Sequence, residues 1–203
     1  GIDSFSGYSP FRTQTFRDEC AKYGIRIEYV DDGANYQKRL QNISDGKIDM
    51  AVFTFDALMK CSSILNDIPA TIVLPTDESK GADAALCAGK MFPNLDSVND
   101  PDVKIVCVRN SPSETMFRVC MTNFNLSRMA ADPFEFYDSA EEVYRQYQQA
   151  KSADKKIFVM WEPYVSKTLQ NPDYHCLIDS SKFRGYIFDG LVARRGFLVK
   201  NEN

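Results

Sequence analysis

The spacing of apolar and polar positions predicts helices and strands that alternate along the first third of the chain. Apolar stripes typical of amphipathic helices occur over residues 13–22, 35–44 and 56–65. Alternating or continuous apolar runs predict strands over residues 25–30, 48–55 and 70–74. The run at 48–55 is almost wholly apolar, which is typical of a strand buried on both faces of a parallel sheet.

A second set of elements follows in the rest of the chain. Helices are predicted over residues 113–124, 140–150 and 164–170. Strands are predicted over residues 103–108, 135–137, 156–161, 176–178 and 186–193. Strands that alternate with helices indicate an α/β fold with right-handed crossovers.

Two such sets predict two lobes, each a mixed, mostly parallel sheet flanked by helices. The first lobe is predicted to comprise residues 1–77 plus 184–203, and the second residues 78–183. Crossings between the lobes are expected near residues 76–82 and 179–186. A ligand is expected beyond the carboxyl ends of the strands, where open α/β sheets collect ligands.

Charge and hydropathy narrow the choice of partner. The net charge is −4 and the basic residues are scattered, so we expect no nucleic-acid partner. No apolar run approaches the roughly 20 residues of a membrane helix, so we expect no membrane insertion of this segment. The chain opens with Gly1 and not Met, and it is therefore interpreted as a processed or excised segment whose export the sequence leaves open.

The six cysteines form no CxxC pair, and His175 is the only histidine. We therefore expect no metal site and no cofactor. Several cysteines lie among apolar residues, which favours free buried thiols and a reducing compartment; one or two disulfides remain an alternative.

Candidate ligand-binding residues stand where predicted strands end. Hydroxyls, backbone amides and flat aromatic faces there can hold a small polar solute. The candidates are Ser6, Gly7, Tyr8, Thr54, Asp56, Asp77, Ser111, Ser113, Trp161 and Glu162. The alternatives are structural: Asp56, Ser111 and Ser113 as helix caps, and Trp161 as a core residue. Asp77, like its neighbours Glu78 and Asp83, has the alternative of a solvated loop acid.

Signals of catalysis are weak in this sequence. It has no GxSxG elbow, no P-loop and no dinucleotide-binding glycine pattern. His175 stands in a polar stretch and is expected to be an exposed loop residue, so a catalytic Ser–His or Cys–His pair is not favoured. We therefore predict that the protein is not an enzyme.

Four segments together resemble the type 2 periplasmic solute-binding proteins of ABC importers, nearest the branch of nitrate, sulfonate, taurine and thiamine-precursor receptors. They cover residues 45–51, 77–84, 110–114 and 161–164 and occur in the family's order. The opening residues 1–8 also resemble substrate-binding domains of bacterial envelope proteins. The chain ends earlier than full-length relatives, so the resemblance is to a minimal or truncated version.

The resemblance implies two lobes, a hinge of two strands and a ligand in the cleft between them. It implies a periplasmic or envelope location, although six cysteines leave a cytoplasmic setting open. The expected partners are a small polar or zwitterionic solute and either an ABC permease or other domains of the parent protein. An anionic end is predicted at Ser111 and Ser113, an amine end at Asp56 and Glu162, with Tyr8 and Trp161 flanking the solute.

Three functions follow from these observations. The favoured one is a solute-binding component of a transport or sensing system. The alternatives are an interaction or structural domain of a larger envelope protein that has lost its solute, and, less favoured, an enzyme on the same fold.

Overall fold

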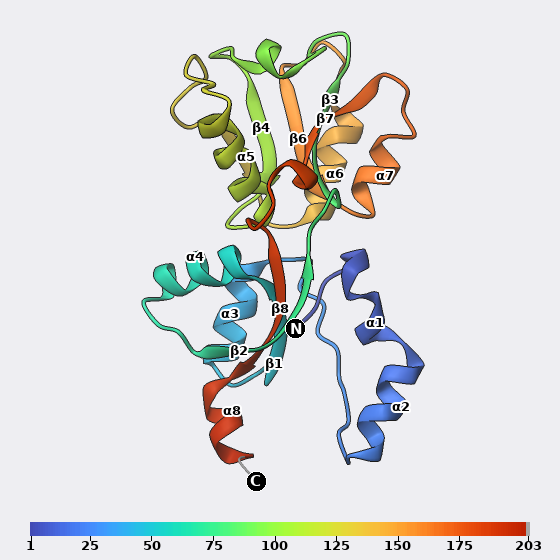
Figure 1. The fold of residues 1–203 in the computed structure, drawn as a ribbon, viewed down its shortest axis with the longest axis vertical. Coiled ribbons are helices and arrows are strands. Elements are labelled where there is room, and N and C mark those ends of the chain that lie inside the picture. The colour runs from blue at the N-terminus through green and yellow to red at the C-terminus, as the bar shows by residue number, and fades with distance from the viewer. Residues whose placement is uncertain (202–203) are drawn as a thin grey trace.

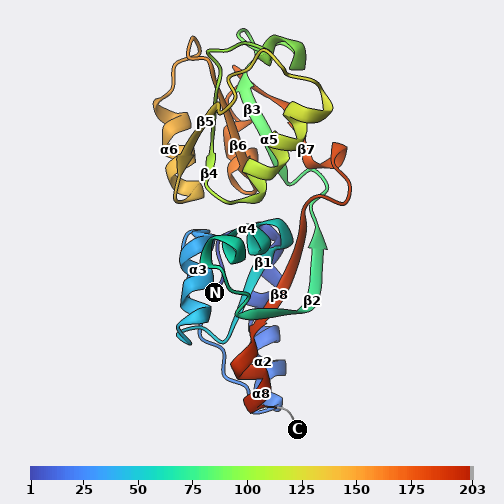
Figure 2. The same ribbon diagram turned by 90° about the vertical axis from the view of Figure 1, so that its left-hand side faces the viewer.

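The computed structural model describes residues 1–201 and contains two sheets, each at the centre of one half of the molecule (Figure 1). Residues 202–203, the end of the predicted first lobe, lie outside the described residues. We call the two parts the three-strand half and the five-strand half. Figure 2 shows that two chain segments connect them, one leading out of β2 and one leading into β8.

The three-strand half is built on β1 (Met50–Thr54), β8 (Phe188–Arg194) and β2 (Ala70–Glu78), in the order β1-β8-β2. Both pairings are antiparallel, so the predicted mostly parallel sheet is wrong for this half. Its helices are α1 (Ser9–Arg12), α2 (Gln14–Lys22), α3 (Tyr36–Ser44), α4 (Phe55–Leu65) and α8 (Arg195–Lys200).

Beside this sheet, parallel strand contacts are limited to one isolated bridge and single hydrogen bonds. The strand predicted over residues 25–30 makes one hydrogen bond to the N-terminal segment, from the Ile2 amide to the Val30 carbonyl (3.0 Å), and a parallel bridge joins Ile2 to Asp31. The Val52 amide of β1 donates to the Gly1 carbonyl at 3.0 Å. Ile25 is 55% exposed, so the segment lacks the burial that would extend this contact into a ladder.

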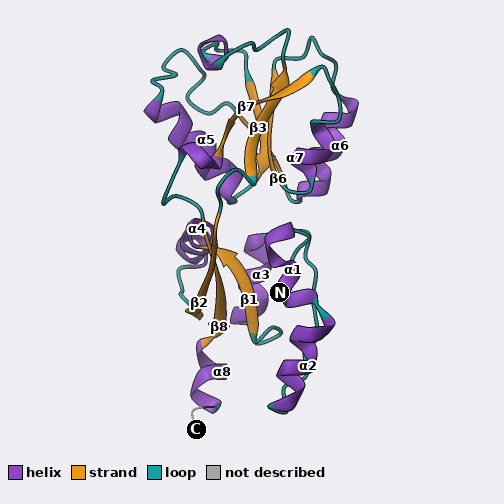
Figure 3. Ribbon diagram, turned by 45° about the vertical axis from the view of Figure 1, so that its right-hand side comes forward, coloured by secondary structure: helices purple, strands orange, loops and turns teal. Residues whose placement is uncertain are grey.

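The five-strand half contains β3 (Asp83–Ala88), β4 (Lys104–Val108), β5 (Phe134–Tyr137), β6 (Lys156–Trp161) and β7 (Tyr174–Asp179), in the order β5-β4-β6-β3-β7. Its sheet is mixed: β4 pairs in parallel with β5 and β6, whereas β3 is antiparallel to β6 and β7. The helices α5 (Pro112–Asn123), α6 (Ala140–Gln149) and α7 (Tyr164–Thr168) cover it, with α5 on one face and α6 and α7 on the other (Figure 3).

Sequence patterns missed β3, an interior strand of this sheet. Its residues, Asp-Ala-Ala-Leu-Cys-Ala, are all buried, but three alanines give no strong strand preference. Burial against both neighbours decides the conformation here, and no period-2 alternation reveals it in advance.

Two apolar clusters form the core. One lies between the five-stranded sheet and α5 and includes Val103, Ile105 and Phe117. The other begins at the α6 and α7 face of the same sheet and continues into the three-strand half, reaching Tyr8 and Leu40. The two halves are therefore packed against each other through a continuous apolar layer.

Candidate functional site

A small cavity lies where the two halves meet. Aromatic side chains make up much of its wall, and all of them are buried: Phe5, Tyr8, Tyr36 and Trp161. Its volume is about 10 Å³, at the lower limit of roughly 10–15 Å³ that a single water molecule needs. In this arrangement the cleft is closed around its own side chains.

Each sheet contributes one cross-strand pair to the cavity. In the three-strand half, Thr54 at the end of β1 lies opposite Asp189 on β8. In the five-strand half, Asp83 at the start of β3 lies opposite Trp161 at the end of β6. The sheet ends that face each other thus carry a hydroxyl, two carboxyl groups and an indole.

Two polar atoms at this cavity are buried without a partner. Within residues 1–201, neither Thr54 Oγ1 nor Asp83 Oδ1 has a hydrogen-bond partner, although both residues are at least 97% buried. An unmade hydrogen bond of this kind costs about 1–3 kcal/mol. Both residues line the same cavity.

Burial sets the charge state of the two carboxyl groups. It raises the pKa of Asp83 to about 7, an effect that the Ser79 hydroxyl partly offsets by donating to Oδ2. It raises the pKa of Asp189 to about 8, although the Tyr8 hydroxyl donates to Oδ1. Both groups therefore gain or lose a proton near neutral pH, according to what lies beside them.

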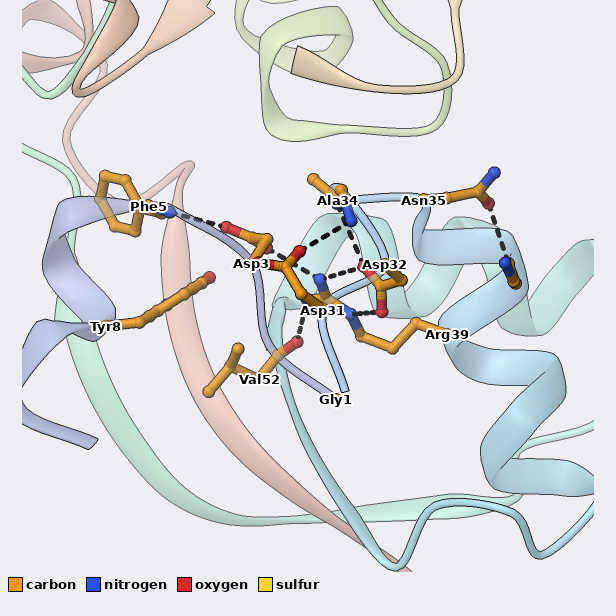
Figure 4. A network of polar contacts seen from close by, with 12 residues as sticks. Gly1, Asp3, Phe5, Tyr8, Asp31, Asp32, Ala34, Asn35, Arg39 and Val52 are labelled. Carbon is orange, nitrogen blue, oxygen red and sulfur yellow. Dashed lines mark hydrogen bonds and ion pairs between the residues drawn. The ribbon is translucent and has the colours of Figure 1, made fainter. Parts of the chain in front are cut away.

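The N-terminal segment that carries Phe5 is held by a buried ion-pair network (Figure 4). The Arg39 guanidinium is fully buried and donates to Asp32, to Asp3 (2.9 Å) and to the Val52 carbonyl (2.7 Å). Asp3 in turn accepts a hydrogen bond from the Phe5 amide at 2.9 Å. Arg39 thus fixes the N-terminal segment that carries Phe5 and Tyr8.

Three of the predicted ligand residues line this cavity: Tyr8, Thr54 and Trp161. Ser6 is exposed, Gly7 is partly exposed, and Asp77 is exposed on β2 beside Asp189. None of these three lines the cavity.

The other four predicted residues serve local contacts or face a different junction. The Ser111 hydroxyl donates to the Val108 carbonyl (2.7 Å), and Glu162 accepts two hydrogen bonds from Ser166 at the start of α7. Ser113 Oγ is buried without a partner in the described chain. Asp56 accepts a hydrogen bond from Thr115, which joins α4 to α5 across the cleft.

Six residues of the cavity are absent from the sequence-based prediction: Phe5, Tyr36, Asp83, Pro112, Ile187 and Asp189. For the two acids a signal existed, because each is a single carboxyl group next to or inside an apolar strand. Asp83 was interpreted with Asp77 as a solvated loop acid. The structure shows Asp83 to be 2% exposed, so that interpretation is wrong for Asp83.

The histidine was also predicted wrongly. His175 lies on β7 and is partly buried, with Nε2 2.8 Å from the Phe92 carbonyl and 3.3 Å from Cys87 Sγ. An Nε2 that donates to a carbonyl cannot accept the thiol proton, and burial raises the pKa of Cys87 to about 12. This contact therefore does not produce a reactive thiolate.

All six cysteines are free, and four of them are buried, as the apolar surroundings favoured. No group of three potential metal ligands occurs within residues 1–201. Over the same residues, no helix has the length and apolar character needed to span a bilayer.

Neither a protein-family profile nor a curated protein matches the sequence. Solved structures do match over nearly the whole chain. The periplasmic aliphatic sulphonate-binding protein SsuA of Escherichia coli aligns with a TM-score of 0.71 at 17% identity, covering 98% of this chain and 66% of that one.

Two further structures agree with this alignment. The alkanesulfonate-binding SsuA of Xanthomonas axonopodis pv. citri, bound to MOPS, gives a TM-score of 0.76 at 15% identity, covering 98% of this chain and 66% of that one. A Candida albicans protein with the generic periplasmic binding protein fold gives 0.75 at 10% identity, covering 98% and 64%. The chain therefore has the α/β fold of the type 2 periplasmic binding proteins, and it spans slightly less than two thirds of the length of these three.

Proposed function

We propose that the protein binds a small polar solute in the cleft between its two halves, as the substrate-binding component or domain of a transport or sensing system. The observation that carries this proposal is the pair of buried, unpartnered atoms, Thr54 Oγ1 and Asp83 Oδ1, at one cavity. The fold supports it, because the two SsuA proteins are sulfonate-binding proteins of the same architecture.

The closed cleft must open for a solute to reach it, and the crossing segments supply a hinge in this proposal. Ser79 and Ser180, one from each crossing, have their hydroxyl oxygens 2.8 Å apart. Gly81 between β2 and β3 has φ +105°, a conformation that side chains rarely allow. A small φ/ψ change at such positions is enough to swing one half relative to the other.

Contacts across the mouth of the cleft would hold the closed state. Thr115 of α5 donates to Asp56 of α4, and Lys60 Nζ lies 3.6 Å from Glu114 Oε1. Both contacts break when the halves separate. In the proposed function, they and the ligand together determine the fraction of closed molecules.

The remaining predictions belong to the same proposal. The proposed lobes are residues 1–77 plus 184–203 and residues 78–183, and the proposed setting is the periplasm or cell envelope, with an ABC permease or further domains as partner. Ser113, whose buried hydroxyl is unpartnered within the described chain, remains a candidate for an anionic end of a zwitterionic solute.

A second function is favoured by one observation, the small volume of the cavity, about 10 Å³. A cleft that stays closed around Phe5, Tyr8 and Trp161 would make the protein an interaction or structural domain of a larger assembly. The two functions differ in whether any small molecule stabilises the folded chain.

The test is a thermal-shift screen against amino acids, sulfonates, nitrate, phosphate, polyamines and pyrimidines. A solute that binds only the folded protein adds about 2.7 kcal/mol of stability at 100 times its dissociation constant. We expect one chemical class to raise the melting temperature of the wild type and to lose this effect in Asp83→Asn. A flat response to the whole panel would favour the interaction domain.

A further inference from the structure

The charge that the lining of the cavity can carry is negative. Two carboxyl groups line it, from Asp83 and Asp189, and among the residues that the structure describes no lysine, arginine or histidine does so. The acids Asp56 and Asp77 add negative potential at Asp83, and Asp77 and Asp3 add it at Asp189. An anionic ligand would find no cationic partner here, and either carboxyl group would repel it when charged.

The guanidinium nearest to the aromatic residues is not available to a ligand. Arg39 lies 5.0 Å from the centre of the Tyr36 ring, but its N–H groups are bonded to Asp3, Asp32 and the Val52 carbonyl. Using it for an anion would break a buried ion pair, which strongly destabilises a folded protein because a charge is left buried without its partner.

The aromatic residues around the acids suit a positive charge. The face of an aromatic ring is negative, so an ammonium group enclosed by several rings is attracted to them, most strongly when water is excluded. Phe5 and Tyr8 pack edge to face, 5.0 Å between ring centres, and form one aromatic wall. Trp161, next to Asp83, forms another.

The two unpartnered atoms indicate which kind of cation fits. Asp83 Oδ1 accepts hydrogen bonds, and so does Thr54 Oγ1. A cation with N–H groups can donate to both, whereas a quaternary ammonium has none to donate.

From these contacts we infer that the solute is a small organic ammonium with N–H donors, held by Asp83, Asp189 and Thr54 inside the aromatic wall. This inference rests on the proposed function of solute binding. It separates the protein from the sulfonate-binding proteins that share its fold, whose named ligands carry a sulfonate group.

The experiment uses three probes with one alkyl chain and different charge: butylammonium, 1-butanol and butane-1-sulfonate. The set of cations also includes tetramethylammonium, putrescine and agmatine. Binding is measured at pH 8 by calorimetry and by the emission of Trp161, the only tryptophan in the chain. We expect saturable binding of butylammonium or the other N–H cations, weaker binding of tetramethylammonium, and none of the alcohol or the sulfonate.

Variants connect the binding to the cavity. Asp83→Asn and Asp189→Asn should each weaken cation binding at least tenfold, and the control Asp18→Asn, an exposed acid on α2, should leave it within twofold. If the asparagine variants unfold, Thr54→Val gives a second test. Its hydroxyl has no partner within residues 1–201, so the variant should fold and still bind the N–H cations at least threefold more weakly.

The outcomes separate the inference from the proposed function. Binding of butane-1-sulfonate with a Trp161 response would overturn the inference and leave solute binding intact. Cation binding that is unchanged in both the Asp83 and the Asp189 variants would also overturn it. If no probe binds and the wider solute screen is flat, the inference and the proposed function fail together.

Discussion

The two halves of the molecule are stabilised by different kinds of buried contact. The five-strand half packs apolar side chains on both faces of a continuous sheet. The three-strand half has a shorter sheet and fixes its N-terminal segment with a buried arginine and two buried aspartates. The site therefore has one wall on a rigid sheet and a second wall, Phe5 and Tyr8, whose position depends on an ion-pair network.

Breaking that network should have the largest effect. Arg39→Met leaves Asp3 and Asp32 buried without their partner, and we expect a loss of about 3–5 kcal/mol in the free energy of unfolding. By contrast, a buried change in the core of the five-strand half, Ile157→Val, should cost only about 0.5–1.5 kcal/mol. Urea denaturation measures both, and equal losses would contradict the contrast between the halves.

The carboxyl groups of the cavity should make stability depend on pH. Their folded pKa values of about 7 and 8 exceed the ordinary value of about 4. The stabilisation is fully present below pH 4 and is lost as pH rises through 7 and 8, because the folded protein holds protons that the unfolded chain releases. The charged and hydrogen-bonding groups that act on Asp83 and Asp189 are Asp3, Tyr8, Asp56, Asp77 and Ser79.

We expect the free energy of unfolding to fall between pH 5 and pH 8 by more than about 1.4 kcal/mol, the value of one pKa unit. Asp189→Asn should flatten this slope. A slope of the same size in Asp189→Asn would show that Asp189 does not contribute to it.

The sequence also predicts the two halves unequally. The pattern located β4 and β6 well, because each is an apolar run that the fold buries. It also located the partly buried β5, which has aromatic residues at alternate positions. It failed at residues 25–30, where a strand needs a neighbour that the fold does not supply, and at β3, whose alanines are strand only because β6 and β7 enclose them.

The site follows the same rule. Tyr8, Thr54 and Trp161 could be predicted because ligands collect at strand ends. Asp189 gives a signal as a lone carboxyl group in an apolar strand, but its place in the site could not be predicted. It lies opposite Thr54 only through antiparallel pairing of β8 with β1, a pairing between segments more than 130 residues apart. The predicted mostly parallel sheet also excluded it.

A smaller effect should come from the unpartnered hydroxyl. Thr54→Val removes a buried polar atom that makes no hydrogen bond to the described residues, so the variant should be about 1 kcal/mol more stable while losing affinity for the solute. Thermal denaturation measures the gain in stability, and calorimetry measures the loss of affinity. A variant that is less stable than the wild type would show that the hydroxyl already serves the fold.

The smallest effect is expected at the mouth of the cleft. Thr115→Val leaves the Asp56 carboxylate without its donor from the other half, which should destabilise the closed state by about 1 kcal/mol or less. We expect a larger radius of gyration in small-angle X-ray scattering without solute. No expansion would mean that the apolar layer alone keeps the halves together.

The most direct test of the central claim, that the cleft is a solute site, is a titration of Trp161 emission with each solute that stabilises the protein. Trp161 is the only tryptophan, is 3% exposed and lines the cavity. A solute bound in the cleft should give a saturable change in emission with the same dissociation constant as calorimetry, and Asp83→Asn should remove it. Stabilising solutes that leave the emission of Trp161 unchanged would contradict the account.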